Sequence, residues 1–199
     1  MLKSGSELCR RDLYLNRLIT FQDTEPVKII TGIRRCGKSS LMKLMVLHLR
    51  QTGVIDVQII EMNFESMDFR RMTAEELYRY VKERLPEKKR AYLFFDEIQR
   101  IDQWQDAVNS FRVDFDCDIY VTGSNSKLMS SEISTYLTGR YISIPVFTLS
   151  FAEYLEFKKD SGRTPKELLN EYIRMGGFPI VALGNFDERS SYQIVEGIY

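Results

Sequence analysis

Cysteine and histidine are scarce in this sequence of 199 residues. Its three cysteines, Cys9, Cys36 and Cys117, are odd in number and widely spaced, so neither a disulfide framework nor a zinc site is indicated. The single histidine, His48, has no cysteine or second histidine near it, which favours packing or a helix surface over catalysis.

An excess of charge of either sign is also missing. Lys plus Arg and Asp plus Glu both total 28, so the net charge is zero and no global positive field attracts nucleic acid. Two basic runs, Arg70-Arg71 and Lys88-Lys89-Arg90, leave room for a local nucleic-acid contact, but such runs are more often solvated faces.

Long apolar runs are absent as well. No run approaches the length of a membrane span, and residues 1–7 lack the apolar core of a signal peptide. We therefore expect a soluble, cytoplasmic protein without a membrane partner. At this length the chain can form one sizeable core and a small appended unit.

Against this background, residues 32–39, Gly-Ile-Arg-Arg-Cys-Gly-Lys-Ser, match the phosphate-binding pattern G-x-x-x-x-G-K-[ST], or Walker A motif, in full. An apolar, strand-like run (27–31) precedes the motif, and a helical pattern (40–50) follows it. Such a loop is an anion cradle, because backbone N–H groups and the helix dipole both face it. The alternative is a strand-to-helix turn that binds nothing.

The motif predicts separate roles for its residues. Gly32 and Gly37 let the backbone turn and approach a phosphate closely. Lys38 is expected to reach the β- and γ-phosphates of a nucleotide, and the Ser39 hydroxyl to hold Mg²⁺. The other positions expected to contact the nucleotide are Ile33, Arg34, Arg35, Cys36 and Ser40.

Cys36 lies beside Lys38 and the helix N-terminus, and both lower the pKa of a thiol. We therefore expect faster alkylation at Cys36 than at Cys9 or Cys117, with an inert, packed thiol as the alternative.

Strand-like and helical patterns alternate along the chain. Further strands are predicted at residues 57–64, 91–95, 117–122 and 141–144. Thr73–Glu76 is a capping box that opens a helix, which must stop near Pro86. Right-handed βαβ crossovers then imply a three-layer α/β domain with a mainly parallel sheet, from about residue 12 to residue 145. One more helix, capped near Asp102, is expected to point these side chains inward: Trp104, Ala107, Val108 and Phe111.

Two adjacent acids, Asp96 and Glu97, follow the apolar run 91–95 and form a candidate Walker B site. Ligands of parallel sheets bind beyond the carboxyl ends of the strands, where the phosphate loop also lies. Asp96 can hold Mg²⁺, and Glu97 can polarise the water that attacks a γ-phosphate. The plainer interpretation is a solvated acidic turn.

Two more segments are candidates for catalytic groups. Residues 122–126, Thr-Gly-Ser-Asn-Ser, end the fourth strand, and Asn125 can bond the γ-phosphate or orient the water. By itself this segment is also a typical turn. Arg140 precedes the fifth strand and can supply charge to a phosphoryl transition state, or it can be an exposed arginine or the partner of a carboxylate.

After Pro145 the strand pattern ends and helices follow. Ser150–Glu153 is another capping box, and Thr164-Pro165 opens a helix. We expect residues 1–145 to be a nucleotide-binding domain, and residues 146–199 to be a helical lid and the beginning of a further region, with the chain as the N-terminal part of a longer protein. The apolar face of the 165–175 helix is expected at Leu168, Leu169, Tyr172 and Ile173.

Together these residues resemble the AAA+ superfamily of P-loop ATPases. More narrowly, they are similar to prokaryotic predicted ATPases in which an AAA domain precedes a nuclease-like C-terminal domain. The resemblance covers about residues 11–179. It rests on the segments 31–39, 95–99 (Phe-Asp-Glu-Ile-Gln), 122–126, 137–140 (Leu-Thr-Gly-Arg) and 176–179 (Gly-Gly-Phe-Pro).

This resemblance implies a five-stranded sheet of order 5-1-4-3-2, ATP and Mg²⁺ as ligands, and a helical lid. It implies Asn125 as a sensor and Arg140 as a finger that reaches a neighbouring subunit of a homo-oligomer. It places segment 12–15 at the adenine and calls for a lid arginine, for which Arg163 and Arg174 are the candidates. An unknown protein or nucleic-acid partner would belong to the C-terminal domain.

The function that these patterns favour is hydrolysis of Mg-ATP, coupled to an unknown partner. A nucleotide-dependent switch or scaffold with little turnover is the main alternative. A small-molecule kinase shares the phosphate loop, but residues 126–140 contain no cluster of arginines, and the Asp96-Glu97 pair favours water as the acceptor.

Overall fold

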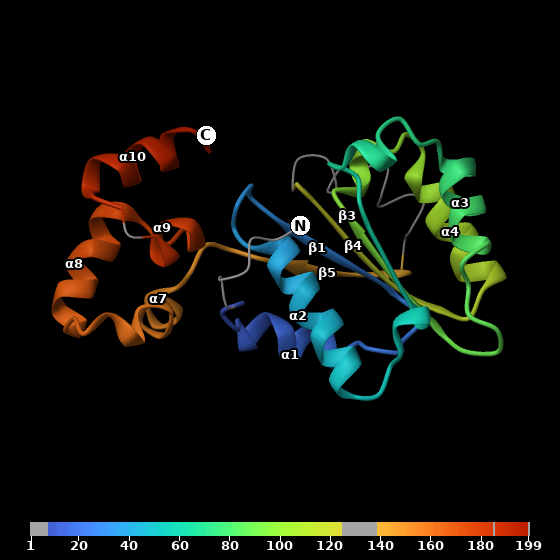
Figure 1. Ribbon diagram of the computed structural model, residues 1–199, viewed down its shortest axis with the longest axis horizontal. Helices are drawn as coiled ribbons and strands as arrows, with labels where there is room; N and C mark the ends of the chain where they lie inside the picture. The colour runs from blue at the N-terminus through green and yellow to red at the C-terminus, as the bar shows by residue number, and fades with distance from the viewer. Residues whose placement is uncertain (1–7, 125–138, 185, 199) are drawn as a thin grey trace.

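The computed structural model describes residues 8–124, 139–184 and 186–198. An α/β unit and a smaller group of helices lie side by side, connected by the chain that leaves the last strand (Figure 1). All strands of the α/β unit are parallel and have the order β2-β3-β4-β1-β5, which is the order that the family resemblance implied. The strands are β1 (Val27–Gly32), β2 (Ile59–Asn63), β3 (Ala91–Asp96), β4 (Cys117–Ser124) and β5 (Tyr141–Pro145).

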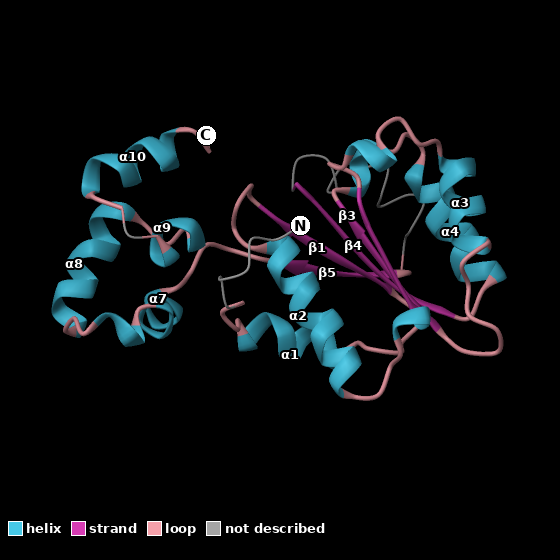
Figure 2. Cartoon of the chain, in the orientation of Figure 1, coloured by secondary structure: helices cyan, strands magenta, loops and turns pink. Residues whose placement is uncertain are grey.

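Helices cover both faces of this sheet (Figure 2). One face packs against α1 (Asp12–Thr20) and α2 (Lys38–Gln51), and the other against α3 (Ala74–Lys82) and α4 (Trp104–Asp114). Every residue of β1 and β3 is buried, as expected for central strands of a sheet covered twice. The four apolar residues that we expected on the inner side of α4 are buried: Trp104, Ala107, Val108 and Phe111.

Two local predictions in this unit need correction. Asp56–Gln58 forms a short 3-10 helix, η1, so the second strand begins at Ile59 and not at residue 57. Helix α4 begins within the expected segment 102–105, but its N-cap, Gln103, has a left-handed conformation (φ 57°) and makes no side-chain capping bond. Two further 3-10 turns follow strands, η2 (Met67–Phe69) and η3 (Ile98–Arg100).

The smaller unit consists of short helices around its own apolar centre. The elements are α7 (Phe151–Phe157), η4 (Lys159–Ser161), α8 (Pro165–Met175), α9 (Pro179–Leu183) and α10 (Glu188–Glu196). The capping boxes at Thr73, Ser150 and Thr164 are present as predicted. The apolar face expected on α8 is only partly buried, because Leu168 lies inside while the Ile173 side chain is 71% exposed.

A buried polar network closes the amino-terminal edge of the sheet. Lys28 of β1 and Asp118 of β4 form an ion pair with no solvent exposure and a Nζ–Oδ1 distance of 2.5 Å. The Tyr120 hydroxyl and the Asp23 amide both donate to the second oxygen of Asp118. Burial lowers the pKa of Lys28 more than the attraction of Asp118 raises it.

Among the helices that the structure describes, none is long and apolar enough to span a bilayer.

Candidate functional site

The predicted site residues gather at the carboxyl-terminal edge of the sheet. Strand β1 ends at Gly32 and runs into the phosphate loop, while β3 ends at Asp96. Strand β4 lies between them, with Thr122 opposite Ile30 of β1. Residues that are 60 or more positions apart in the chain therefore meet at the edge where ligands of parallel sheets bind.

The phosphate loop is held in place by close packing at Gly32. A Cβ atom on Gly32 would lie 2.3 Å from the Val146 carbonyl oxygen and 2.7 Å from the Cys36 sulfur. Only glycine permits this approach of the loop to the segment that follows β5. Gly37, at the other end of the loop, has φ 104°, a conformation that side chains other than glycine rarely adopt.

Several backbone N–H groups of the loop have no partner. In the described part of the chain, the amides of residues 34, 35, 37, 39 and 40 have no hydrogen-bond acceptor, and the Cys36 amide makes only a long bond (3.4 Å) to the Ile33 carbonyl. The Lys38 amide faces the Cys36 sulfur. No side chain caps α2, whose N-cap is Gly37. These unpaired donors at a helix N-terminus fit an anion.

The Lys38 side chain turns back into the loop. It is 5% exposed, and its Nζ donates to the carbonyls of Gly32 and Ile33, at 3.1 Å each. The same nitrogen lies 4.0 Å from Oε1 of Glu97. The ammonium group therefore stands between the loop and the acid that follows β3, which is where a phosphate chain held by the loop amides would need positive charge.

Asp96 is fixed by two donors that belong to the neighbouring strands. The Thr122 hydroxyl donates to Oδ1 at 2.5 Å, and the Asn63 amide donates to Oδ2 at 3.3 Å. Asp96 is 9% exposed. Each carboxylate oxygen keeps one lone pair, so Asp96 can still accept a bond from a metal-bound water or bind a metal directly.

Glu97 follows Asp96 in a left-handed conformation (φ 58°) that turns its side chain toward Lys38. Its backbone N–H donates to the Thr122 hydroxyl at 3.0 Å, so this one hydroxyl contacts both acidic residues. Gln99 donates to Oε2 of Glu97 at 2.5 Å. Oε1 remains on the Lys38 side, and the carboxylate is partly open to solvent.

A magnesium site fits these residues without a dense ligand cluster. Within the described ranges, no group of three or more His, Cys, Asp or Glu side chains is arranged to hold a metal. Mg²⁺ at nucleotide sites needs only one or two protein oxygens, because phosphates and waters supply the rest. Ser39, in the first turn of α2, and Asp96 can provide these oxygens.

The sequence did not predict the roles of Thr122, Asn63 and Gln99. Thr122 lies in a segment that we singled out for Asn125, but Asn125 is outside the described residues. Asn63 is the last residue of β2, and only the pairing of β2 with β3 places it opposite Asp96. The sequence signal that could have identified them is a polar residue at the carboxyl end of a predicted strand, because such ends meet at one edge of a parallel sheet.

Cys36 is fully buried, contrary to the expectation of a reactive thiol. Burial raises the pKa of the Cys36 thiol, and this effect outweighs the opposing influence of Lys38. The thiol is therefore packed, as in the alternative interpretation, and its rate of alkylation stays a prediction. By contrast, the neighbouring loop residues Ile33, Arg34 and Arg35 are exposed.

Arg140 is exposed and lies at the opposite edge of the sheet from the phosphate loop. Its carbonyl accepts a bond from the amide of Val27, the first residue of β1, whereas the loop starts at the last residue, Gly32. The five intervening steps correspond to about 16 Å along the strand. Arg140 makes no ion pair with any described residue. It therefore lies away from the phosphate loop of its own chain.

The two candidate lid arginines have partners inside the helical unit. Arg163 pairs with Glu171, and Arg174 lies 3.4 Å from Glu188. Neither arginine is among the residues that line the small hollow next to the start of α2. In segment 12–15, which the family resemblance placed at the adenine, Tyr14 and Leu15 are buried in the core with α2. The contact of this segment with an adenine stays a prediction.

A hollow of about 100 Å³ adjoins the start of α2. One wall is the α2 surface with Gly37, Ser40 and Leu41, and the opposite wall includes Phe157 and Pro179 of the helical unit. Residues Leu8, Cys9 and Arg11, before α1, complete it. The hollow is mainly apolar and lies next to the anion cradle.

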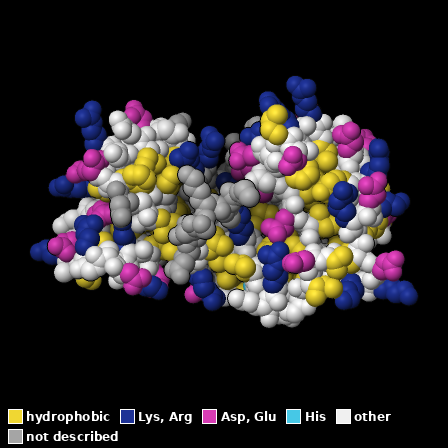
Figure 3. Space-filling view, in the orientation of Figure 1, with side chains coloured by type: hydrophobic (Ala, Val, Ile, Leu, Met, Phe, Trp, Pro, Cys, Tyr) yellow, Lys and Arg dark blue, Asp and Glu magenta, His cyan; other side chains and the backbone are white. Residues whose placement is uncertain are grey.

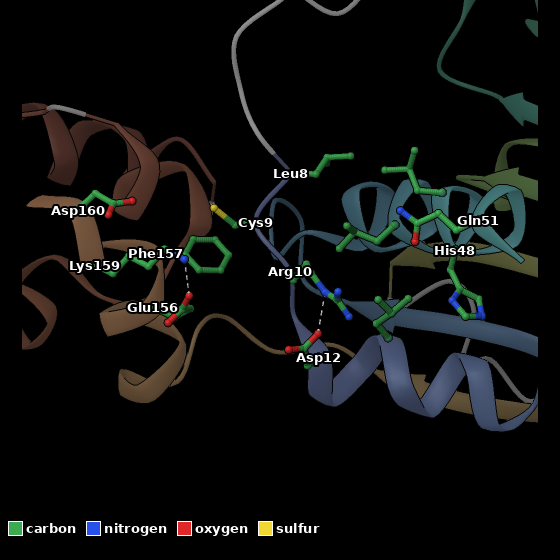
Figure 4. A pocket seen from close by; sticks show the side chains of 13 residues that line it. Leu8, Cys9, Arg10, Asp12, His48, Gln51, Glu156, Phe157, Lys159 and Asp160 are labelled. Carbon is green, nitrogen blue, oxygen red and sulfur yellow. Dashed lines mark hydrogen bonds and ion pairs between the residues drawn. The ribbon is translucent and has the colours of Figure 1, made fainter.

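A larger groove of about 650 Å³ continues from this hollow along α1 and α2. Figure 4 shows Phe157 beside Cys9 on one side and His48 with Gln51 of α2 on the other. His48 is half-buried on the helix surface, which agrees with the plainer interpretation of this residue. Over the face seen in Figure 3, positive and negative side chains are interspersed and do not form a single basic patch.

A family model described as an AAA domain matches residues 24–155. Two curated relatives, both uncharacterised, are similar over nearly the whole chain. A Haemophilus influenzae protein is 39% identical over 193 residues (95% of this chain, 48% of that protein), and a Methanocaldococcus jannaschii protein is 33% identical over 207 residues (97% and 45%). The chain thus spans less than half the length of either relative.

Solved structures with the same fold include the Walker-type ATPase of Pyrococcus abyssi, with a TM-score of 0.65 at 16% identity, over 96% of this chain and 73% of that one. A DNA polymerase III gamma subunit-related protein of Thermotoga maritima has a TM-score of 0.56 at 14% identity, over 91% and 58%. At these identities the likeness shows the fold alone.

Proposed function

This chain belongs to the AAA domain family, and from this premise we propose that it binds Mg-ATP and hydrolyses it to ADP and phosphate at the carboxyl edge of its sheet. The observation that carries the proposal is the position of Lys38, inside a loop of unpaired amides and 4.0 Å from the Glu97 carboxylate. A cradle for the phosphates and a base for the attacking water thus stand side by side.

In this proposal the loop amides and Lys38 bind the β- and γ-phosphates. Ser39 and Asp96 hold Mg²⁺, which neutralises phosphate charge when it is bound. The apolar hollow beside Ser40 and Leu41 takes the adenine, because a purine needs a mainly apolar slot next to the phosphate site.

Glu97 is the group that we propose for activating water. Its Oε2 is held by Gln99, so Oε1 is the oxygen that can accept a proton from water on the γ-phosphate side. The water oxygen then bonds to the γ-phosphorus, and the bond from that phosphorus to the bridging oxygen breaks, which leaves ADP and phosphate. Asn125 and Arg140 are proposed to stabilise the charge that develops, Arg140 from a neighbouring copy.

A nucleotide-dependent switch with little turnover is the second candidate function. The placement of Arg140 at the far edge of the sheet favours it, because a single copy then offers no arginine to the γ-phosphate from this position. We propose that the protein or nucleic-acid partner is bound by the part of the longer relatives that this chain does not match. We also propose that residues 1–145 form the nucleotide-binding domain, and that residues 146–199 form the helical lid and the beginning of a further region.

Thermal unfolding with and without nucleotide tests the binding step. At 100 times the Kd, Mg-ATP should stabilise the fold by about 2.7 kcal/mol, or roughly 5–10 °C in Tm for a chain of this size. Lys38→Ala should abolish the shift. Lys43→Ala, on the same helix but outside the loop, should keep it. An unchanged melting curve of the wild type in saturating Mg-ATP would rule out the proposed function.

A further inference from the structure

Arg11 connects three segments that lie far apart in the chain. It is the residue before α1, and its side chain is 5% exposed. Its guanidinium contacts the Cys36 carbonyl of the phosphate loop, the chain between β5 and α7, and Glu153 in the first turn of α7. No sequence motif marks this role.

All five N–H groups of Arg11 are used in these contacts. Nε and one N–H of Nη2 donate to the two oxygens of Glu153, at 2.7 and 3.1 Å. Nη1 donates to the carbonyls of Cys36 (3.0 Å) and Phe147 (2.9 Å), and Nη2 also donates to that of Thr148 (3.4 Å). Since a guanidinium has five donors, Arg11 has none left for a nucleotide. Its role is therefore positioning and not ligand binding.

The bond to Cys36 has a direct consequence for the phosphate cradle. In a planar trans peptide, the carbonyl and the following N–H point in opposite directions. By holding the Cys36 carbonyl, Arg11 turns the Gly37 N–H to the other side of the peptide, away from the guanidinium. Gly37 is one of the residues whose amide has no acceptor among the residues that the structure describes.

Glu153 connects the same guanidinium to the helical unit, which is the proposed lid. It is the N3 residue of α7 and also accepts bonds from the Ser150 amide and hydroxyl. Burial alone would raise the pKa of Glu153, but its bonds with Arg11 and Ser150 outweigh this effect and lower that pKa. If α7 moved away, a buried guanidinium would lose its counter-charge, which is costly.

We propose that Arg11 couples the position of helix α7, in the helical unit that serves as the lid, to the orientation of the Gly37 amide. The phosphate loop is then competent to bind phosphate only while the lid is docked. The coupling to nucleotide affinity rests on the proposed function. The coupling within the protein does not, because it concerns contacts made without nucleotide.

Three conservative variants test this coupling. Arg11→Lys keeps the charge but cannot bridge all three segments, and Glu153→Gln keeps the capping box but removes the charge. Glu171→Gln is the control, because Glu171 is a carboxylate with less solvent exposure than Glu153 (8% against 20%) and its ion pairs, with Arg163 and Lys158, lie wholly within the helical unit. The readouts are the Gly37 amide NMR resonance without ligand, and the affinities for ATP and for inorganic triphosphate.

Arg11→Lys and Glu153→Gln should each shift the Gly37 resonance in the nucleotide-free protein. Each should also lower the affinities for ATP and for triphosphate about 10-fold, as expected for lost bonds to a charged group. The double variant should be no worse than the more severe single variant, because the two residues act as a unit. The control should leave the Gly37 resonance and both affinities unchanged.

An unmoved Gly37 resonance in both variants, or an equal change in Glu171→Gln, would overturn the coupling. If the wild type binds neither ATP nor triphosphate, the proposed function fails. The Gly37 resonance alone then tests the coupling between α7 and the Gly37 amide.

Discussion

At the scale of single residues, Glu97 shows how the backbone sets a chemical role. Its left-handed conformation places the backbone N–H on the Thr122 hydroxyl and the carboxylate toward Lys38. A residue other than glycine in this conformation is uncommon, and such strain gathers at functional sites. Asp96, one residue earlier, faces Thr122 and Asn63 instead. Two adjacent acids thus have different surroundings, which suits the different roles proposed for them.

The first prediction at this scale concerns the two acids. Glu97→Gln should retain ATP binding and lose about 10²- to 10⁴-fold in turnover, because the amide has nearly the same shape but cannot accept the proton of water. Asp96→Asn should instead weaken the Mg²⁺-dependent part of binding. Steady-state phosphate release and titrations with and without Mg²⁺ separate the two effects. If both variants hydrolyse ATP as the wild type does, the site is wrongly assigned.

The second prediction concerns Cys36. Because burial raises its thiol pKa, the reactive thiolate is depleted at pH 8, and the buried sulfur is also shielded from reagent. Alkylation of Cys36 in the folded protein should be much slower than in protein unfolded by urea, as followed by mass spectrometry. Equal rates in the two states would contradict this account of the loop.

At the scale of elements, the two edges of the sheet have different roles. The carboxyl edge carries unpaired amides and the candidate catalytic groups, while the amino edge is closed by the Lys28–Asp118 pair. This pair joins the adjacent central strands β1 and β4, whose carboxyl ends carry the loop and Thr122. We therefore expect it to support the site only through the stability of the sheet.

Removing one partner of this buried pair should be strongly destabilising. Lys28→Met leaves Asp118 as an uncompensated buried charge, and the expected loss is about 3–5 kcal/mol in the free energy of unfolding, measured with urea. The double variant Lys28→Met with Asp118→Asn should recover part of that loss. Lys43→Met is the control, because the Lys43 side chain is only half-buried and forms no ion pair with another described residue. A loss below about 1 kcal/mol for Lys28→Met would contradict the prediction.

At the scale of the whole molecule, the position of Arg140 bears on whether the proposed turnover needs two copies. The phosphate loop lies at the carboxyl ends of the strands and Arg140 at the amino ends, so Arg140 can serve a site only in a neighbouring copy. The β5 strand beside Arg140 is an edge strand, paired on one side with β1, and Arg17 donates to its Ser143 carbonyl.

If Arg140 acts in a neighbouring copy, specific ATPase activity should rise with protein concentration. Arginine fingers contribute about 10³ to 10⁵ in rate, so the effect should be large. Mixing Arg140→Ala with Lys38→Ala should restore some activity, because each variant supplies what the other lacks. Activity strictly proportional to protein concentration, without rescue on mixing, would leave Arg140 as a surface residue.

The sequence alone determined the α/β class and the position of the phosphate loop, whereas the order of the strands came from the family resemblance. The first two follow from local features: the glycine spacing around Lys38, the apolar run before Asp96, and the capping boxes at Thr73, Ser150 and Thr164. Each of these depends on a few neighbouring residues, and such patterns can be read directly along a chain.

Only the tertiary structure decided which side chains hold the site together. Arg11 acts on carbonyls and on a glutamate 142 positions away, and Asn63 reaches Asp96 only because β2 pairs with β3. Burial likewise reversed the expected pKa shift of Cys36, since desolvation depends on atoms that surround the thiol in space. Hydrogen bonds to main-chain carbonyls require no particular partner residue, so they leave no pattern in the sequence.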